Sequence, residues 1–213
     1  MTRSKPAKQW MRRHVRDPYV KQAVRSGYRS RAAFKLAGID DRDRILRPGM
    51  VVLDLGASPG GWSQVAAERV RPGGRVVAVD LLAIEAISGV IIVRGDVGAT
   101  ATRAAIATAL AGVDVDLVLS DMAPNLSGVR SVDEARSQAL VLLALEFAGY
   151  VLKPGGGFLV KVFHGCGLDA VIREMRGAFA EVSIRKPAAS RSQSSEVYVL
   201  CRGLMRRASA PVA

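Results

Sequence analysis

Cysteine, aromatic residues and long apolar runs are all scarce in this chain of 213 residues. Its two cysteines stand 35 positions apart, which fits neither a disulfide framework nor a metal-binding motif. The longest apolar run, Ala139 to Leu152, covers 14 residues and contains Glu146, whereas a membrane span needs about 20. The N-terminus also lacks the apolar segment of a secretory signal. These absences predict no metal site, no membrane span and a protein of the reducing cytoplasm.

Acidic residues are scarce only toward the two ends of the chain. Residues 1–49 hold 14 Lys and Arg against 4 acidic residues, a net charge of +10, and residues 185–213 hold 6 against 1, or +5. Residues 50–184 hold 11 against 14, or −3. A mildly acidic middle with basic flanks predicts a domain that carries out chemistry and flanks that hold a polyanion such as nucleic acid. Basic ends that serve only solubility are the alternative.

The length suits one domain with a sizeable core and short additions. We divide the chain into a basic N-terminal extension at residues 1–28, a main domain at 29–205 and a C-terminal tail at 206–213. The first eight or so residues are polar and weakly periodic, so we expect part of the extension to be disordered.

Short β-rich runs alternate with helical segments along the main domain. This alternation predicts a mostly parallel, seven-stranded sheet with helices on both faces, because parallel strands need crossover connections. The expected strands are residues 51–56, 75–81, 89–96, 115–121, 157–163, 181–186 and 196–202. The expected helices are residues 30–46, with Ser30 as candidate N-cap, 61–70, 100–111, 132–152 and 168–179.

The segment VVLDLGASPGGWSQ, residues 51–64, is a strand that ends near an acid and a glycine, turns through Gly60 and Gly61, and enters a helix. Nucleotide-like ligands sit at this end of a strand in open α/β sheets, where glycine permits close backbone approach. The spacing differs from that of dinucleotide-binding loops, and there is no Walker lysine. Asp54 beside Gly56 resembles the first motif of S-adenosylmethionine-dependent methyltransferases and suits a positively charged cofactor. A tight turn without a ligand is the alternative.

Further acids stand where later strands are expected to end, namely Asp80, Asp96 and Asp121. Parallel strands present their carboxyl ends at one edge, so we expect these side chains to lie together with the glycine loop. The acid after the second strand can accept both hydroxyls of a ribose. Each aspartate taken alone could instead be a helix cap or a turn residue.

A lysine interrupts the apolar segment GGGFLVKVFHG, residues 155–165. An ammonium group is costly to bury without a partner, so Lys161 must be paired, exposed at a strand end, or functional.

The motifs RSRAAFKL, DLGASPGGWSQ, VVAVDLL, SDMAPN, VKVF and SSEVY stand in this order between about Asp17 and Gly203. With these motifs the sequence closely resembles the FtsJ/RrmJ (RlmE) family of RNA ribose 2′-O-methyltransferases, whose bacterial members methylate a uridine in 23S ribosomal RNA of the large subunit. The resemblance implies a Rossmann-like methyltransferase fold for residues 29–205, S-adenosylmethionine as cofactor, ribosomal RNA as partner and a cytoplasmic, monomeric enzyme.

The resemblance also implies the site residues. The family's catalytic Lys-Asp-Lys-Glu tetrad maps onto Lys35, Asp121, Lys161 and Glu196. The expected cofactor-binding residues are Asp54, Gly56, Ser58, Pro59, Gly60, Gly61, Trp62, Asp80, Leu81, Asp96, Val97 and Asp121. Ser58 stands where many relatives have Ala. We assign no catalytic role to His164 or Cys166, where relatives vary.

Methyl transfer to a ribose hydroxyl requires the oxygen to lose its proton and gain nucleophilic character. A base within hydrogen-bond reach and a positive charge near the developing alkoxide can each assist. We therefore expect Lys161 to be the central catalytic residue, as base or as alkoxide stabiliser, with Asp121 orienting it. Lys35 and Glu196 would orient the ribose and balance charge.

The basic flanks are expected to grip RNA through Arg12, Arg13, Arg16, Lys21, Arg25, Arg29, Arg31, Arg185, Lys186 and Arg191. Trp10, Tyr19 and Tyr28 stand among these charges and could either stack on bases or pack against the core.

Four other functions stay open at this point. Transfer RNA or an mRNA cap could be the methylated substrate, and a non-catalytic RNA-binding assembly factor could keep the fold, although all four tetrad residues are present. A metal-dependent small-molecule methyltransferase would have little more than Asp121 and Asn125 as ligands. A dehydrogenase fits the architecture but not the glycine spacing.

Overall fold

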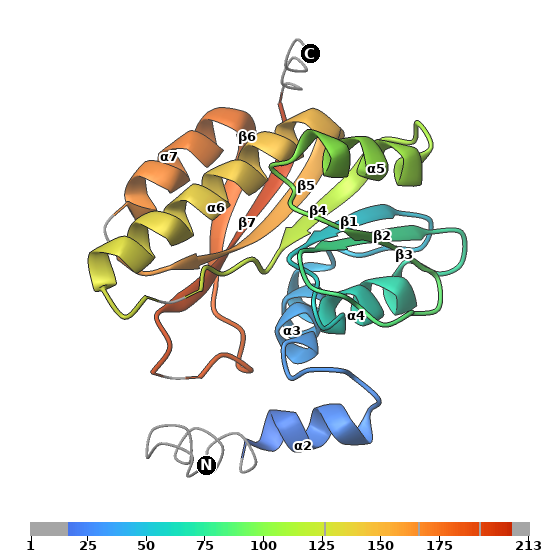
Figure 1. Cartoon of the computed structure of the whole chain (residues 1–213), viewed down its shortest axis with the longest axis horizontal. Coiled ribbons are helices and arrows are strands. Elements are labelled where there is room, and N and C mark those ends of the chain that lie inside the picture. The colour runs from blue at the N-terminus through green and yellow to red at the C-terminus, as the bar shows by residue number, and fades with distance from the viewer. Residues whose placement is uncertain (1–16, 126, 166, 192, 206–213) are drawn as a thin grey trace.

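A single seven-stranded sheet organises the chain (Figure 1). The computed structural model describes residues 17–125, 127–165, 167–191 and 193–205. The strands are β1 (Val51–Leu55), β2 (Arg75–Asp80), β3 (Val90–Arg94), β4 (Val115–Ser120), β5 (Leu152–Phe163), β6 (Phe179–Arg185) and β7 (Glu196–Leu204). They lie in the order β3-β2-β1-β4-β5-β7-β6, and β7 runs antiparallel to both of its neighbours. The predicted fold class, a mostly parallel seven-stranded sheet, is confirmed.

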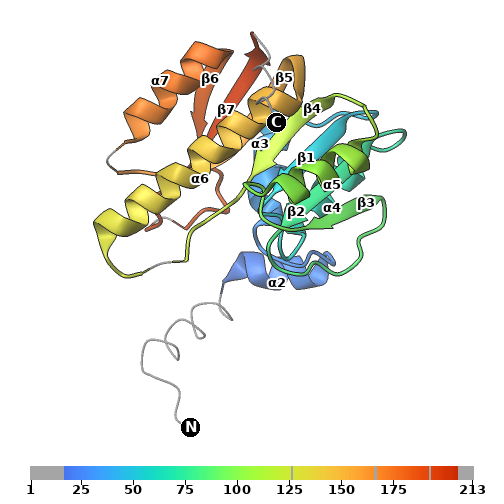
Figure 2. The same cartoon turned by 45° about the horizontal axis from the view of Figure 1, so that its top comes forward.

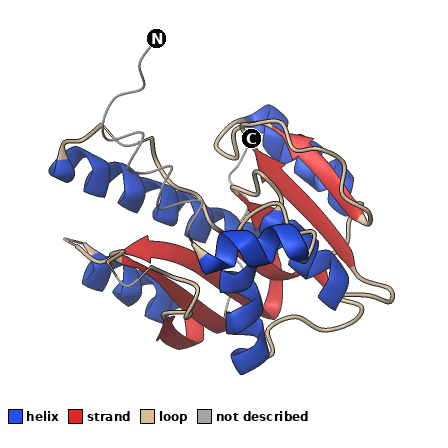
Figure 3. Cartoon of the chain, turned by 90° about the horizontal axis from the view of Figure 1, so that it is seen from below, coloured by secondary structure: helices blue, strands red, loops and turns tan. Residues whose placement is uncertain are grey.

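Helices cover both faces of the sheet, as the alternating sequence predicts (Figure 3). They are α2 (Pro18–Arg25), α3 (Ala33–Asp43), α4 (Gly61–Arg69), α5 (Thr100–Leu110), α6 (Arg130–Val151) and α7 (Leu168–Ala178). Apolar side chains of α5, α6 and α7 pack on one face, which is toward the viewer in Figure 2. Those of α3 and α4 pack on the other face.

The alternation of side chains along β5 assigns Lys161 to a face. Phe158, Val160 and Val162 belong to the core under α6 and α7, whereas Leu159 belongs to the core under α3 and α4. Side chains two residues apart share a face, so Lys161 points to the side of α3. The lysine that interrupts the apolar run is therefore directed toward the helix that carries Lys35.

The N-terminal part of the chain differs from the sequence prediction. Residues 18–25, within the predicted extension, form α2, which begins at Pro18 with the Asp17 side chain accepting a hydrogen bond from the Tyr19 backbone N–H at 3.0 Å. Ser30 is not an N-cap, because α3 begins after Ala32 and no side chain caps it. The disorder predicted for the first residues lies outside the described part of the chain.

Two element boundaries also differ. The helix predicted at 30–46 ends at Asp43, where Arg44 takes a left-handed conformation with φ of 50°. Strand β5 begins at Leu152 rather than 157, with a register shift against β4 that leaves Lys153 to Gly156 out of the regular ladder. Within the described residues, no helix is long and apolar enough to cross a membrane.

Candidate active site

A cavity of about 390 Å³ lies at the carboxyl ends of the central parallel strands. The order of the strands reverses at β1, between β2 and β4, and this is the position where open α/β sheets bind ligands. The cavity is lined by Leu55, Gly56, Ser58, Val79, Asp80, Leu81, Leu82, Gly95, Asp96, Val97, Asp121, Met122, Ala123, Asn125, Leu140 and Leu143. The three strand-end aspartates thus meet at one edge, as predicted.

Gly56 is required by the close approach of two loops. Its φ of 73° is in the left-handed region, and a Cβ there would lie 2.7 Å from Met122 Cγ and 2.9 Å from the Met122 backbone nitrogen. The absence of a side chain lets the loop after β1 lie against the loop after β4, and both loops line the cavity.

Asp80 fixes the glycine loop to the end of β2. Its two carboxylate oxygens accept hydrogen bonds of 2.8 Å from the backbone N–H groups of Ser58 and Leu82. Each oxygen has a second lone pair, so the carboxylate can still accept hydroxyl donors from a ligand in the cavity. Asp96 similarly accepts a hydrogen bond from the Gly98 N–H at 2.8 Å.

Five of the predicted cofactor residues do not line this cavity, namely Asp54, Pro59, Gly60, Gly61 and Trp62. Trp62 is buried, packs against Tyr198 with ring centroids 5.5 Å apart, and donates from Nε1 to the Ala32 carbonyl at 2.9 Å. The hydrogen bond joins α4 to the segment before α3, and the ring contact joins α4 to β7. A direct cofactor contact for these five residues stays a prediction.

Asp54 is completely buried, and the Ser63 hydroxyl donates to its Oδ2 at 2.6 Å. Its Oδ1 has no hydrogen-bond partner among the described residues. Burial, reinforced by the negative charges of Asp121 and Asp80, raises the pKa of Asp54 to about 7 despite the Ser63 hydrogen bond. Asp54 is therefore an internal carboxyl whose pKa lies far above its ordinary value.

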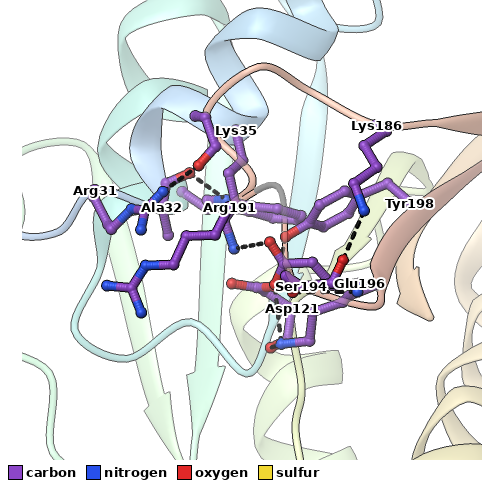
Figure 4. A network of polar contacts seen from close by, with 12 residues as sticks. Arg31, Ala32, Lys35, Asp121, Lys186, Arg191, Ser194, Glu196 and Tyr198 are labelled. Atoms are coloured by element: carbon purple, nitrogen blue, oxygen red, sulfur yellow. Dashed lines mark hydrogen bonds and ion pairs between the residues drawn. The ribbon is translucent and has the colours of Figure 1, made fainter. Parts of the chain in front are cut away.

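The four predicted tetrad residues come from different elements and lie in two ion pairs. Figure 4 shows three of them, Lys35, Asp121 and Glu196. Lys161 Nζ lies 3.0 Å from Asp121 Oδ1 and donates to the Asp121 backbone carbonyl at 2.6 Å. Lys35 Nζ, on α3, lies 2.6 Å from Glu196 Oε1, at the start of β7. Lys161 is buried, and its contacts with Asp121 use two of its three donors.

Glu196 is held in its ionised form. Burial would raise its pKa, but the hydrogen bond and charge of Lys35, together with the charge of Lys161, outweigh burial and hold the pKa below its ordinary value. The site therefore contains a carboxylate that remains negative at neutral pH and balances Lys35.

Tyr198 is a site residue to which the sequence analysis gave no role. It lies directly across the β5–β7 ladder from Lys161 and donates from its hydroxyl to Asp121 Oδ1 at 3.3 Å. Burial and the neighbouring Asp121 charge raise the pKa of Tyr198, so it remains a donor. Its position two residues after Glu196, on the same face of a strand, was a signal available in the sequence.

A second cavity, of about 260 Å³, adjoins the tetrad and is lined by Arg31, Lys35, Arg191, Ser194 and Glu196. Arg31 pairs with Asp17 and donates to the Ala189 carbonyl, and Arg191 Nε lies 3.5 Å from the same Asp17 carboxylate. Asp17 thus holds two arginines at the rim.

Arg29 contacts two segments next to the first cavity but does not line that cavity. Its guanidinium donates to the carbonyls of Pro59 at 3.2 Å and of Glu85 and Ala86, both at 2.8 Å. Pro59 belongs to the glycine loop, and the other two belong to the segment that follows Leu81 and Leu82. One side chain therefore joins both loops to the segment before α3.

The residues predicted to bind RNA differ in whether they are described, exposed or already paired. Arg12, Arg13, Arg16 and Trp10 lie outside the described residues, and Lys21 and Arg25 are exposed on α2. Arg185 pairs with Asp43 at 2.7 Å, and Lys186 donates to the Ser194 carbonyl at 2.7 Å. Tyr19 and Tyr28 both pack against Phe34 of α3, and Tyr28 also packs against the core under α3 and α4.

Metal-ligating side chains do not cluster in the described part of the chain, where no three His, Cys, Asp or Glu residues could hold an ion together. His164 is exposed, and Cys166 lies outside the described residues.

The strand order and the acid-lined cavity at the carboxyl ends of β1, β2 and β4 are those of a Rossmann-like methyltransferase. Within that class, the model of the FtsJ-like methyltransferase family matches residues 28–204. The chain therefore belongs to the FtsJ-like methyltransferase family.

Several relatives are similar to this chain over nearly its whole length. The ribosomal RNA large subunit methyltransferase E of Alkalilimnicola ehrlichii is 56% identical over 197 residues, which are 92% of this chain and 94% of the relative. The protein of the same name from an Azoarcus species is 55% identical over 200 residues, 94% of this chain and 98% of the relative. A solved structure from Plasmodium falciparum, described as a ribosomal RNA methyltransferase, has a TM-score of 0.78 at 28% identity and covers 84% of this chain and all of its own.

Proposed function

We propose that this protein methylates the 2′-oxygen of a uridine ribose in 23S ribosomal RNA of the large subunit, with S-adenosylmethionine as donor. The observation that carries the proposal is the position of Lys161, buried between the acid-lined cavity and the Lys35–Glu196 pair. Asp121 connects the cavity to the tetrad, because it lines the cavity and also contacts Lys161. The names of the relatives support ribosomal RNA as the substrate class.

The cofactor cavity suits S-adenosylmethionine in its chemistry. Asp80 and Asp96 offer carboxylates to hydroxyl groups, and Leu81, Leu82 and Met122 offer apolar surface to a base. Asp121, at the inner end, offers negative charge to a sulfonium. When bound there, S-adenosylmethionine supplies an electrophilic methyl group.

The tetrad residues act on the ribose. The 2′-oxygen forms a bond to the methyl carbon while the bond from that carbon to sulfur breaks, and the hydroxyl proton must leave. Lys161 is placed to assist, either by accepting that proton or by donating to the developing alkoxide through the donor that Asp121 leaves free. Lys35, neutralised by Glu196, and Arg31 and Arg191 at the rim hold the ribose and the adjoining backbone.

Replacement of Lys161 tests the proposal. We expect Lys161→Ala to lower the single-turnover rate of 2′-O-methylation of large-subunit ribosomal RNA by at least about 10²-fold, a typical contribution of acid–base catalysis. Affinity for S-adenosylhomocysteine, measured by calorimetry, should change little. Mapping of 2′-O-methyl groups on the RNA product identifies the nucleotide.

Lys161→Arg is the matched variant, because arginine keeps the charge but does not act as a base at neutral pH. Residual activity in Lys161→Arg supports alkoxide stabilisation, and complete loss supports proton abstraction. Full turnover by Lys161→Ala would contradict the assignment, and methylation only of transfer RNA or capped mRNA would change the substrate class.

A further inference from the structure

A third cavity, of about 330 Å³, lies at the opposite edge of the sheet from the cofactor cavity, at the amino ends of β1 and β4. It is lined by Arg44, Ile45, Arg47, Met50, Asp116, Leu117, Lys153, Gly155, Gly156, Gly157, Leu200, Cys201 and Arg202. None of these residues takes part in the tetrad or the cofactor cavity. Four of them are basic and one is acidic.

Two of the four cations are neutralised within the protein. Lys153 Nζ lies 2.5 Å from Asp116 Oδ1. Arg202 lies 3.4 Å from Glu181 and 3.6 Å from Asp43. Their charges are therefore balanced, and they shape the wall of the cavity rather than attract a ligand.

Arg44 and Arg47 are different. Both are exposed, and neither guanidinium has an ion pair or hydrogen bond with any other residue that the structure describes. They come from the short connection between α3 and β1 and lie on one rim of the cavity. The cavity thus has an excess of two positive charges, which favours an anion.

The wall formed by β5 is made of backbone. A Cβ at Gly156 would lie 2.9 Å from the Lys153 carbonyl oxygen, and one at Gly157 would lie 3.2 Å from Leu117 Cδ1. Side chains are therefore disfavoured at this wall, and the space beside the two arginines stays open. A guanidinium is suited to a phosphate group, to which it can donate two parallel hydrogen bonds.

Helix α3 links this cavity to the tetrad. Lys35 lies near the start of α3 and Arg44 caps its end, nine residues later. At about 1.5 Å per residue the two positions are about 14 Å apart along the helix axis. A polyanion that enters the tetrad could therefore reach both places along the same helix.

We propose that this cavity binds a backbone phosphate of the RNA substrate, away from the methylated nucleotide, through Arg44 and Arg47. The proposal rests on the proposed function, since it concerns a second contact with the same RNA. A phosphate contact positions the RNA without reading its sequence. It therefore contributes to affinity and orientation, while the chemical step depends on the tetrad.

The test compares Arg44→Ala/Arg47→Ala with Arg173→Ala/Arg176→Ala, a control pair of exposed arginines on α7 that removes the same charge. Binding of protein-free large-subunit ribosomal RNA is measured over a series of salt concentrations. We expect the first variant to bind roughly tenfold more weakly and to reduce the slope of log K against log salt by about 0.7 to 0.9, the contribution of one phosphate contact. The control variant should lower the RNA affinity and the salt slope less than Arg44→Ala/Arg47→Ala does.

Cofactor affinity and the single-turnover rate at saturating RNA should equal those of the wild type. Arg47→Ala alone provides the test if replacement of Arg44 at its left-handed position impairs folding. A salt slope equal to that of the wild type would overturn the proposal. Weakened binding only to assembled subunits would assign the cavity to a ribosomal protein and would also overturn it. Failure of the wild type to bind ribosomal RNA would overturn the proposed function instead, and this inference with it.

Discussion

Lys161 shows how a charged side chain can occupy an otherwise apolar strand. The buried ammonium donates to a carbonyl and lies against a carboxylate of the same residue, Asp121, so its desolvation is compensated locally. Tyr198 donates to that carboxylate from the neighbouring strand. Since each group supports the next, removal of one member leaves others buried without partners, which is the costly situation for polar groups.

Asp54 gives a prediction about stability and pH. The folded protein holds a proton on this carboxyl up to about pH 7, whereas the ordinary value of the group is 3.8. Between these values the folded state binds more protons than the unfolded state, so the contribution of Asp54 to stability decreases as pH rises. We expect Asp54→Asn, which keeps an acceptor for Ser63, to lack this decrease and to become more stable relative to the wild type between pH 5 and pH 8, by roughly 1 kcal/mol or more.

Urea unfolding of both proteins at the two pH values measures this difference. Ser63→Ala is a useful comparison, because it removes the hydrogen bond to Asp54 without removing the titrating group. A constant stability difference between wild type and Asp54→Asn at the two pH values would show that the carboxyl does not titrate in this range.

At the residue level, the sequence predicted which aspartates line the first cavity. It did not predict the tertiary contacts of the arginines near the site. Asp80, Asp96 and Asp121 were identified because parallel strands place their ends together. The contacts of Arg31 with Asp17 and Ala189 join positions that are 14 and 158 residues apart. Such contacts depend on tertiary packing, and the periodic pattern of a sequence carries no signal for them.

At the level of elements, the segment before α3 lies at the rim of the cavity beside the tetrad and contacts two loops next to the larger cavity. Arg29 binds the loops of the cofactor cavity, while Arg31 lies at the rim of the cavity beside the tetrad. The two side chains stand two residues apart in the sequence and have different partners. This short segment therefore sets the geometry of both cavities together.

We predict that Arg29→Lys raises the KM for S-adenosylmethionine by roughly fivefold to tenfold with a smaller change in kcat. A lysine carries a single nitrogen and cannot reach three carbonyls in the geometry of the guanidinium fork, and each lost hydrogen bond destabilises by about 1 kcal/mol. Steady-state kinetics at saturating RNA measure both parameters, with exposed Arg25→Lys on α2 as control. A lower kcat at unchanged KM would place the effect in the chemical step.

The order and type of the main-domain elements followed from alternation and turn residues, and all seven strands were predicted within a few residues except at the start of β5. Helix α2 was not predicted, because it has only 8 residues and one buried side chain, Ala23. Its start depends on the Asp17 side chain, which also holds Arg31 and Arg191. A short helix fixed by tertiary contacts has a weak periodic signal of its own.

At the level of the whole molecule, positive charge is concentrated at both ends of the sequence, while residues 50–184 carry a net charge of −3. Residues 1–16 contain six Lys and Arg and no acidic residue. We predict that removal of residues 1–16 weakens binding of ribosomal RNA and reduces the salt slope, with cofactor affinity unchanged. Binding assays over a range of salt concentrations and calorimetry with S-adenosylhomocysteine measure the two effects.

Removal of residues 1–25 is the informative comparison, since it also removes Asp17 and α2. The longer deletion should lower the single-turnover rate in addition, because Arg31 and Arg191 lose the carboxylate that holds them beside the tetrad. Equal RNA affinity in the wild type and the shorter deletion would show that the first 16 residues make no contact with the RNA.

The pairing of β5 with β7 limits how this chain can change over evolution. Lys161 lies opposite Tyr198, and Phe163 lies opposite Glu196, so one ladder holds three side chains of the site in register. Insertions between the two strands can lengthen or shorten the connection without moving that register. A single residue inserted inside either strand would turn its site residues to the opposite face of the sheet, under α6 and α7. Homologues are therefore expected to confine length variation to the loops that connect β5, α7, β6 and β7, and to reject it within the paired segments.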